Sequence, residues 1–249
     1  MEWTKDFYHQ QLVWSIDSGA DLHGLRDDLV DKMVRHKENK RTKVLELGGG
    51  PGQFAVAAAK RGYEVTVIDI APAAVRHIEK LAEEHQVEQH IRVLEADFYK
   101  VVFRERFDVI CYWDGFGIGK DADQQQLLQR IADWLKPSGV ALIDIYTPWY
   151  WAATAGQEMQ MGDISRHYGF DAEGSRMTDT WWQTGDKEES IKQSLRCYSP
   201  ADLQLLMKDI NLVLVDLEPG GAMDYEQGSY REQVPLGEAM MFMAKLKWG

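Results

Sequence analysis

The chain has 249 residues, of which 45% are hydrophobic, so it can bury the core of one domain with an embellishment, or of a domain and a small lid. It carries 40 acidic and 28 basic residues, a formal net charge of -12, which opposes binding to polyanions and predicts no nucleic-acid partner. The two cysteines, Cys111 and Cys197, lie far apart and form no ligand-spaced pair, so neither a disulfide framework nor a metal site is expected.

The amino-terminal sequence predicts a cytoplasmic protein. Residues 1–6 lack the basic and then apolar runs of a signal peptide. No apolar stretch reaches the roughly 20 residues that a helix needs to cross a bilayer. We therefore expect a cytoplasmic location and no membrane partner.

Two helices are predicted before the first strand. Apolar residues recur at helical spacing from Trp3 to Trp14, and again from Leu22 to His36. We expect residues 1–42 to form a helical cap on the rest of the chain.

From residue 43 onward, short apolar runs alternate with helical patterns, which is typical of a parallel sheet covered by helices. Farther along the chain, Ser199, Pro200 and Asp202 form the pattern of a capping box that opens another helix. The predicted strands lie near residues 43–47, 64–68, 91–95, 107–112, 139–145, 212–217 and 239–246, and the predicted helices near 53–61, 72–85 and 122–135.

A glycine-rich turn joins the first two of these strands. Gly48, Gly50 and Gly52 let the backbone turn sharply and approach a ligand, and Asp69 closes the next strand, where a carboxylate can bind a ribose diol. Alternatively, the turn only joins a strand to a helix and binds no ligand. Asp69 could likewise only cap the helix that follows it.

The details of the turn favour a cationic ligand without a pyrophosphate. Gln53 stands where a dinucleotide fingerprint has its last glycine, and Pro51 lacks the N–H that a phosphate would accept. Ahead of the turn, the Glu46 carboxylate would repel a phosphate and attract an ammonium or sulfonium group.

Together these segments resemble the class I S-adenosylmethionine-dependent methyltransferases. The segment Glu46–Gly52 is similar to their first motif and Asp69 to their ribose-binding acid. Residues 91–98, 107–114 and 135–143 are similar to their third, fourth and fifth strands, so the likeness covers about residues 43–145. It implies an α/β, Rossmann-like fold with a seven-stranded, mostly parallel sheet, helices on both faces and an antiparallel last strand.

The resemblance also implies where the cofactor binds. Asp97 would bind the adenine amino group and Phe98 would pack on the ring, although a carboxylate at a strand exit is often only a turn former. Trp113 could face the cofactor or pack at the rim. The predicted cofactor site comprises Tyr8, Trp14, Glu46, Gly48, Gly50, Gly52, Asp69, Ile70, Asp97, Phe98 and Trp113, and no metal.

An aromatic-rich insertion at residues 147–198 separates the fifth strand from the helix at Ser199. An insertion of this length is usually functional, and its aromatic side chains could form a lid over a small organic substrate. Packing of the insertion on itself is the alternative. Residues 43–146 and 199–249 would then form the methyltransferase domain.

Three residues are candidates for proton removal from an acceptor. His167 lies in the insertion and has an unperturbed pKa of ~6.5, although a lone histidine is more often structural. Asp114 and Tyr146, at two strand exits, are the other candidates.

We therefore expect an S-adenosylmethionine-dependent methyltransferase that transfers a methyl group to oxygen, nitrogen or carbon of a small organic metabolite and releases S-adenosylhomocysteine. An NAD(P)-dependent oxidoreductase and a non-catalytic S-adenosylmethionine-binding sensor or scaffold are the alternatives. The sequence predicts no particular oligomeric state.

Overall fold

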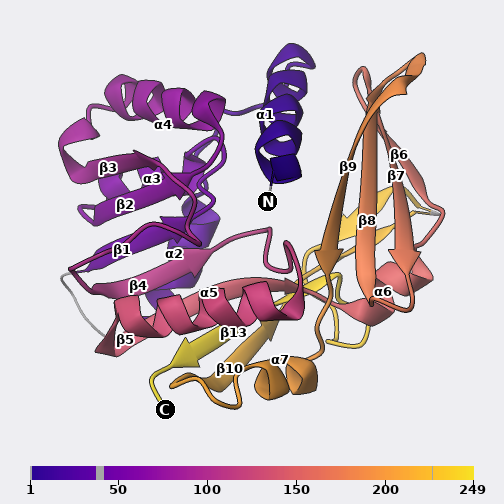
Figure 1. Ribbon diagram of the computed structural model, residues 1–249. Coiled ribbons are helices and arrows are strands. Elements are labelled where there is room, and N and C mark those ends of the chain that lie inside the picture. The colour runs from indigo at the N-terminus through magenta and orange to yellow at the C-terminus, as the bar shows by residue number, and fades with distance from the viewer. Residues whose placement is uncertain (1, 38–41, 226) are drawn as a thin grey trace.

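The computed structural model describes residues 2–37, 42–225 and 227–249. Residues 38–41, at the end of the predicted cap, lie outside the described residues. The principal feature is a seven-stranded sheet in the order β10-β13-β5-β4-β1-β2-β3 (Figure 1). Its strands are β1 (Lys43–Leu47), β2 (Glu64–Asp69), β3 (Ile91–Glu95), β4 (Phe107–Tyr112), β5 (Leu135–Tyr146), β10 (Val213–Pro219) and β13 (Met241–Lys247).

Strands β1 to β5 pair in parallel, and β13 pairs antiparallel with both β5 and β10. The predicted fold is therefore confirmed, including the antiparallel last strand. The central strands β1 and β2 are buried along almost their whole length and are rich in Val, Ile and Leu, as expected of strands that are covered on both faces.

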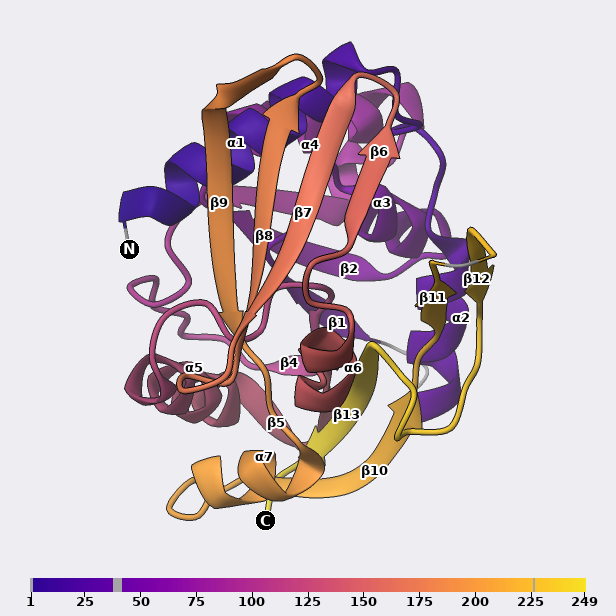
Figure 2. The ribbon, with the colours of Figure 1, turned by 90° about the vertical axis from the view of Figure 1, so that its right-hand side faces the viewer.

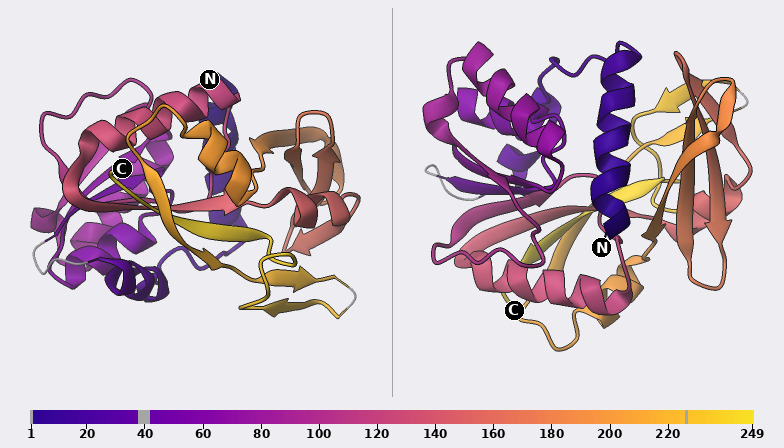
Figure 3. Two further views of the ribbon diagram at one scale, coloured as in Figure 1. Left: turned by 90° about the horizontal axis from the view of Figure 1, so that it is seen from below. Right: turned by 45° about the horizontal axis from the view of Figure 1, so that its top comes forward.

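Helices cover both faces of this sheet. On one face lie α2 (Asp27–His36), α3 (Gln53–Lys60) and α4 (Pro72–Glu84), whose apolar side chains pack in one core with Val44, Val67 and Val109. On the other face lie α5 (Asp121–Trp134) and α7 (Pro200–Leu206), which pack against Leu45 and Ile143. Figure 3 shows these two layers from below.

Helix α7 begins as predicted. The Ser199 hydroxyl accepts a hydrogen bond from the Asp202 backbone N–H at 3.1 Å, and the Asp202 carboxylate accepts one from the Ser199 backbone N–H at 2.9 Å. Pro200 occupies the first turn, where its missing N–H costs nothing.

Two predicted boundaries differ from the structure. Helix α2 begins at Asp27 rather than near residue 22, because the Asp21 carboxylate accepts the backbone N–H groups of His23 and Gly24 and holds a turn there. Strand β5 begins at Leu135 rather than near 139, because Leu135 already pairs with Phe107 before a register shift.

The insertion forms a second sheet. After α6 (Pro148–Ala153) come β6 (Glu158–Met161), β7 (Ile164–Asp171), β8 (Arg176–Gln183) and β9 (Asp186–Arg196), which form an antiparallel meander (Figure 2). Helix α1 (Glu2–Asp17) stands between this small sheet and α4 (Figures 1 and 3). A short hairpin of β11 (Ala222–Asp224) and β12 (Ser229–Arg231) precedes β13, and the 3-10 turn η1 (Glu88–His90) precedes β3.

Candidate functional site

A cavity of about 350 Å³ lies at the carboxyl edge of the parallel strands, which is the usual ligand site of open α/β sheets. The turn after β1 and the exits of β2, β3 and β4 form its floor and sides. Helix α1 and strand β9 enclose it further. Of the residues predicted to bind the cofactor or a proton, the cavity is lined by Tyr8, Glu46, Gly48, Gly50, Asp69, Ile70, Asp97, Phe98, Trp113 and Asp114.

The glycine turn brings bare backbone to this cavity. Gly48, Gly50 and Gly52 have φ values of 65°, 51° and 82°, which side chains disfavour. The backbone N–H groups of Gly48 and Gly49 both donate to the carbonyl of Ile68, at 2.8 and 3.2 Å, and so tie the turn to β2. A Cβ atom at Gly50 would meet no protein atom within 4 Å, so open space lies beside this residue.

Asp69 binds the glycine turn and the residue that precedes the next helix. Its carboxylate accepts the backbone N–H of Gly50 at 2.9 Å and that of Ala71 at 2.8 Å, which forms a turn just before α4 but does not cap that helix, whose N-cap is Ala71. A carboxylate can accept about four hydrogen bonds, which leaves acceptor capacity toward the cavity. Burial raises the pKa of Asp69, although these backbone hydrogen bonds oppose that effect.

Glu46 and Trp113 each carry a buried polar atom without a partner among the described residues. These atoms are Glu46 Oε2 and Trp113 Nε1, and both residues line the cavity. Burial raises the pKa of the Glu46 carboxyl well above its usual range, and the Asp69 charge raises it further. A buried acceptor and a buried donor left unpaired cost stability, so both residues indicate a bound group.

The exits of β3 and β4 provide the opposite side of the cavity. The Asp97 carboxylate accepts the backbone N–H of Tyr99 at 2.9 Å and lies 3.3 Å from Lys100 Nζ. This turn geometry fits the predicted alternative role of Asp97, while its position in the cavity also permits binding. The Phe98 ring packs at 5.5 Å from that of Tyr112.

Asp114 follows β4 and is exposed to the cavity. The Tyr146 hydroxyl, at the end of β5, donates a hydrogen bond to its carboxylate. Burial by the surrounding protein raises the pKa of Asp114, and the Tyr146 hydrogen bond opposes this shift. Tyr146 itself does not line the cavity, but it contacts it through Asp114.

Helix α1 uses different faces for the cavity and for the small sheet. Tyr8 and Leu12 lie on the cavity face at i, i+4 spacing. Trp14 lies about 120° around the helix from Tyr8 and packs with Phe7, Ile164 and Trp181. The prediction that Trp14 faces the cofactor is therefore not supported by its position. Gly52 does not line the cavity either, because it is the residue just before α3 and faces Ile78.

His167 also lies outside the cavity. It occupies β7 between Arg166 and Tyr168, and neighbouring residues of a strand point to opposite faces of the sheet. Arg166 points toward Asp179 and Trp181 on the inner face, so His167 points away from them. The structure therefore does not support His167 as the base.

Sequence reasoning missed a polar cluster around Asp179 on the inner face of the small sheet. Asp179 is 0% exposed and accepts hydrogen bonds from Arg166, Trp181 Nε1 and Gln193 Nε2, at 2.5, 2.7 and 3.2 Å. Gln193 lines the cavity and accepts a hydrogen bond from the Tyr8 hydroxyl at 3.3 Å. These residues come from three strands and a helix, and no local pattern relates them.

Arg26 was missed for a similar reason. It precedes α2, lines the cavity and donates two hydrogen bonds to Asp28, at 2.8 and 2.7 Å. Its guanidinium has further N–H donors. Because Arg26 is distant in sequence from every cavity motif, only the tertiary structure reveals its place.

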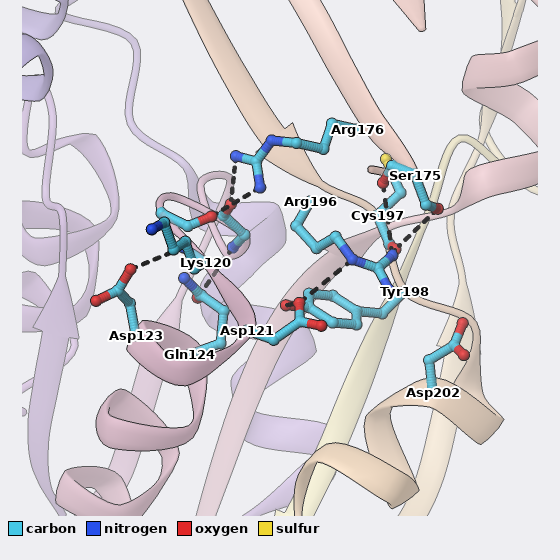
Figure 4. Close-up of polar contacts among 12 residues, drawn as sticks. Lys120, Asp121, Asp123, Gln124, Ser175, Arg176, Arg196, Cys197, Tyr198 and Asp202 are labelled. Atoms are coloured by element: carbon cyan, nitrogen blue, oxygen red, sulfur yellow. Dashed lines mark hydrogen bonds and ion pairs between the residues drawn. The ribbon is translucent and has the colours of Figure 1, made fainter. Parts of the chain in front are cut away.

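The base of the small sheet is fastened to the loop after β4. Figure 4 shows Arg176 and Arg196 reaching from this base toward the start of α5. Arg176 donates to the carbonyls of Gly117 and Gly119, at 3.3 and 2.7 Å, and Arg196 Nε lies 3.3 Å from Asp121 Oδ1. A Cβ atom at Gly117 would lie 2.3 Å from the Arg196 carbonyl oxygen, so only glycine permits this approach. These contacts fix the insertion relative to the loop that carries Asp114.

The comparison with protein families agrees with this geometry. A family model described as a methyltransferase domain matches residues 44–139, which contain β1 to β4 and the glycine turn. Residues 44–139 thus match a methyltransferase domain, in agreement with the predicted resemblance to the class I S-adenosylmethionine-dependent methyltransferases.

Relatives of this methyltransferase domain are distant. The tRNA 5-carboxymethoxyuridine methyltransferase of Escherichia coli is 24% identical over 117 residues, which are 47% of this chain and 45% of that protein. The match thus spans less than half the length of this curated relative. Its name refers to a tRNA nucleoside, so the expected exclusion of nucleic acids stays a prediction from charge alone.

Solved structures resemble this chain over nearly its whole length. The CcbJ methyltransferase from Streptomyces caelestis has a TM-score of 0.77 over 98% of both chains, at 17% identity. An S-adenosylmethionine-dependent methyltransferase from Clostridium acetobutylicum has a TM-score of 0.71 over 95% of this chain and 96% of that one, at 15% identity. At these identities the likeness establishes the fold, which here includes the region of the insertion. Across the described ranges, no helix is both long and apolar enough to span a bilayer.

Proposed function

We propose that this protein is a methyltransferase that binds S-adenosylmethionine in the cavity and methylates a small organic acceptor. The observation that carries the proposal is the unpartnered Glu46 carboxylate oxygen, which lies beside the glycine turn in a cavity of suitable size. A buried carboxylate without a partner is expensive, and a ligand with an ammonium group would relieve that cost.

The charges of the cavity wall fit the amino-acid part of this cofactor. Glu46 would hold its ammonium group and Arg26 its carboxylate, since both side chains line the cavity and have opposite charges. A dinucleotide fits poorly, because its pyrophosphate would meet the carboxylates of Glu46, Asp69, Asp97 and Asp114, whereas Arg26 is the one Lys or Arg among the described residues that line the cavity.

The adenosine part would lie along the exits of β2 and β3. Asp69 would accept the ribose hydroxyls with the acceptor capacity that Gly50 and Ala71 leave unused. Asp97 and Phe98 would hold the adenine, and Ile70 would complete an apolar wall. When bound, the cofactor supplies a methyl group that sulfur activates for displacement.

The residues around the remaining space position the acceptor. Helix α1 and the small sheet enclose the cavity with Tyr8 and Gln193, and this enclosure supports a small organic acceptor. Such a restricted space and the formal net charge of -12 also argue against a nucleic-acid acceptor.

Calorimetry with S-adenosylhomocysteine tests the proposal without knowledge of the acceptor. We expect micromolar binding, and we expect Asp69→Asn to weaken it by about 2 kcal/mol, because a charge-assisted hydrogen bond to the ribose is lost. Absence of any heat at millimolar ligand would refute the proposal.

Asp108→Asn provides a matched control. The Asp108 carboxylate also accepts a backbone N–H, that of Lys43 at 2.8 Å, but it lies at the start of β4, at the opposite edge of the sheet. S-adenosylhomocysteine should bind this variant as tightly as it binds the wild type.

A second measurement tests the oxidoreductase alternative. Addition of the wild-type protein should leave the fluorescence of NADH unchanged, whereas a change would favour that alternative.

A further inference from the structure

Asp114 is the cavity carboxylate that the proposed cofactor leaves without a role. The contacts of the other described carboxylates of the cavity assign each a role. Glu46 faces the glycine turn, Asp69 accepts two backbone N–H groups, and Asp97 binds the Tyr99 N–H and Lys100. In the described part of the chain, the hydrogen-bond partner of the Asp114 side chain is the uncharged hydroxyl of Tyr146. Asp114 therefore presents an anion to the cavity with no cation bonded to it.

The local backbone keeps Asp114 at the cavity. Its φ of 56° is left-handed, a conformation in which Asp and Asn are among the better tolerated side chains. The next residue, Gly115, has a φ of 138°, and its carbonyl accepts the Tyr112 hydroxyl at 2.8 Å. Unfavourable backbone held by surrounding contacts is common at functional sites.

The two nearby arginines, Arg166 and Arg26, each bind a carboxylate other than that of Asp114. The Arg166 guanidinium is bound to Asp179 on the small sheet, and it lies over the Trp181 ring at 4.1 Å. Arg26 is bound to Asp28 and would serve the cofactor carboxylate. The space beside Asp114 is therefore electronegative, and an anionic acceptor would be repelled.

The same space has aromatic walls and an unused donor. Tyr8, Tyr99, Tyr112 and Trp113 line the cavity, and Trp113 Nε1 is buried without a partner among the described residues. Aromatic faces stabilise organic cations, more strongly where water is excluded. A carboxylate without a cation and aromatic side chains thus form the usual recognition elements for an ammonium group.

We propose that the methyl acceptor is an amine that enters the cavity as a cation and is selected by the carboxylate of Asp114. The ammonium group loses one proton to solvent before the reaction, and the nitrogen lone pair then forms the N–C bond as the C–S bond breaks and S-adenosylhomocysteine leaves. This inference rests on the proposed function and narrows it from oxygen, nitrogen or carbon to nitrogen. Asp114 determines specificity by charge, and Tyr146 is a positioning residue that holds the carboxylate in its orientation. A neutral alcohol of the same shape gains no such coulombic attraction.

Matched small probes test the inference. Benzylamine and benzyl alcohol, and a few further amine and alcohol pairs of equal shape, are titrated by calorimetry into protein saturated with S-adenosylhomocysteine. We expect each amine that binds to do so about tenfold or more tightly than its alcohol, as a charge-assisted hydrogen bond predicts. Equal affinities within the pairs, or binding of none of the amines, would overturn the inference.

Asp114→Asn identifies the residue responsible. Asn is also tolerated in left-handed backbone, so the turn should persist, and circular dichroism and the melting temperature check this. The preference for amines should fall to within about twofold, while S-adenosylhomocysteine binds as in the wild type. The control Asp121→Asn changes the net charge equally but removes a carboxylate bound to Arg196 and Tyr198 outside the cavity, and it should retain the preference.

Two results separate this inference from the proposed function. Failure of S-adenosylhomocysteine to bind the wild type would refute the proposed function itself. Retention of the amine preference in Asp114→Asn, with weaker binding of S-adenosylmethionine but not of S-adenosylhomocysteine, would show that Asp114 serves the sulfonium and would overturn only the amine inference. A pH titration tests the same point without a substitution. In the wild type, the preference for amines over alcohols should disappear as the pH falls and Asp114 is protonated.

Discussion

The hydroxyl of Tyr146 donates a hydrogen bond to the carboxylate of Asp114, and this bond joins the exits of two neighbouring strands, β5 and β4, beside the cavity. Both residues follow strands that the sequence predicts, but no sequence pattern around either residue predicts that their side chains form a hydrogen bond. The bond stabilises the ionised form of Asp114 and so opposes the rise in pKa that burial causes.

Tyr146→Phe should therefore raise the pKa of Asp114. The variant loses a hydrogen bond that stabilises the charged carboxylate and keeps the aromatic ring that packs on Trp151 at 5.3 Å. The pKa can be followed by carbon NMR of the labelled Asp114 carboxyl group. Tyr150→Phe is the control, since its hydroxyl contacts the Met223 backbone instead. An unchanged or lowered pKa in Tyr146→Phe would contradict the arrangement described here.

Removal of the Glu46 charge should stabilise the ligand-free protein and weaken cofactor binding. Burial raises the pKa of Glu46, so the folded state holds its proton to higher pH than the unfolded state does. The wild type therefore loses stability relative to Glu46→Gln as the pH rises from the unfolded pKa toward the folded one. Urea unfolding should show a more stable variant at about pH 8 and a smaller difference at about pH 4.

Asp144→Asn is the matched control for this experiment. Burial raises the pKa of Asp144 to about 6, but this carboxyl lies on β5 and does not line the cavity. Replacement of this carboxyl should stabilise the protein above that pKa by up to about 3 kcal/mol and leave S-adenosylhomocysteine binding unchanged. Equal loss of binding in both variants would argue against a specific role of Glu46.

Gly50→Ala should separate the cost of backbone strain from obstruction of the cavity. Gly50 and Gly62 have φ values of 51° and 83°, and a Cβ atom at either would meet no protein atom within 4 Å. Each substitution should therefore lower the free energy of unfolding by about 1–2 kcal/mol. Only Gly50 lines the cavity, so only Gly50→Ala should weaken S-adenosylhomocysteine in calorimetry. Similar affinities of the two variants would place the ligand elsewhere.

Asp179→Asn should be among the most destabilising charge substitutions. Asp179 is fully buried and binds Arg166, Trp181 and Gln193, so its neutralisation leaves the Arg166 charge uncompensated. The free energy of unfolding should fall by about 3 kcal/mol or more in urea titrations. Lys80→Ala breaks an exposed i,i+4 pair with Glu84 and should change it by less than about 1 kcal/mol. A loss below about 1 kcal/mol in Asp179→Asn would show that the cluster contributes little.

Strand and helix positions were predictable because they depend on local periodicity and capping. The strands of the main sheet begin and end close to their predicted residues, and the Ser199 capping box opens α7 as expected. Where boundaries differ, the causes are a side-chain turn at Asp21 and a register shift opposite Phe107, neither of which is visible in apolar spacing.

His167 and Trp14 show why the rest was not predictable. Both were chosen for their chemistry and their place in the chain, yet each lies on the face of its element that is turned away from the cavity. Which face of α1 or β7 meets a ligand depends on how those elements pack against distant ones. Arg26 and Gln193 reach the cavity through the same packing.

The sequence by itself determined the sheet, the glycine turn and the acid that closes β2, because these rest on contacts between residues close in the chain or on the repeat of apolar strands. Only the tertiary structure decided the acceptor side of the cavity, where α1, the exits of β4 and β5, and the small sheet meet. Contacts such as Tyr146 with Asp114 and Arg166 with Asp179 join different strands, so their geometry exists only after the chain has folded.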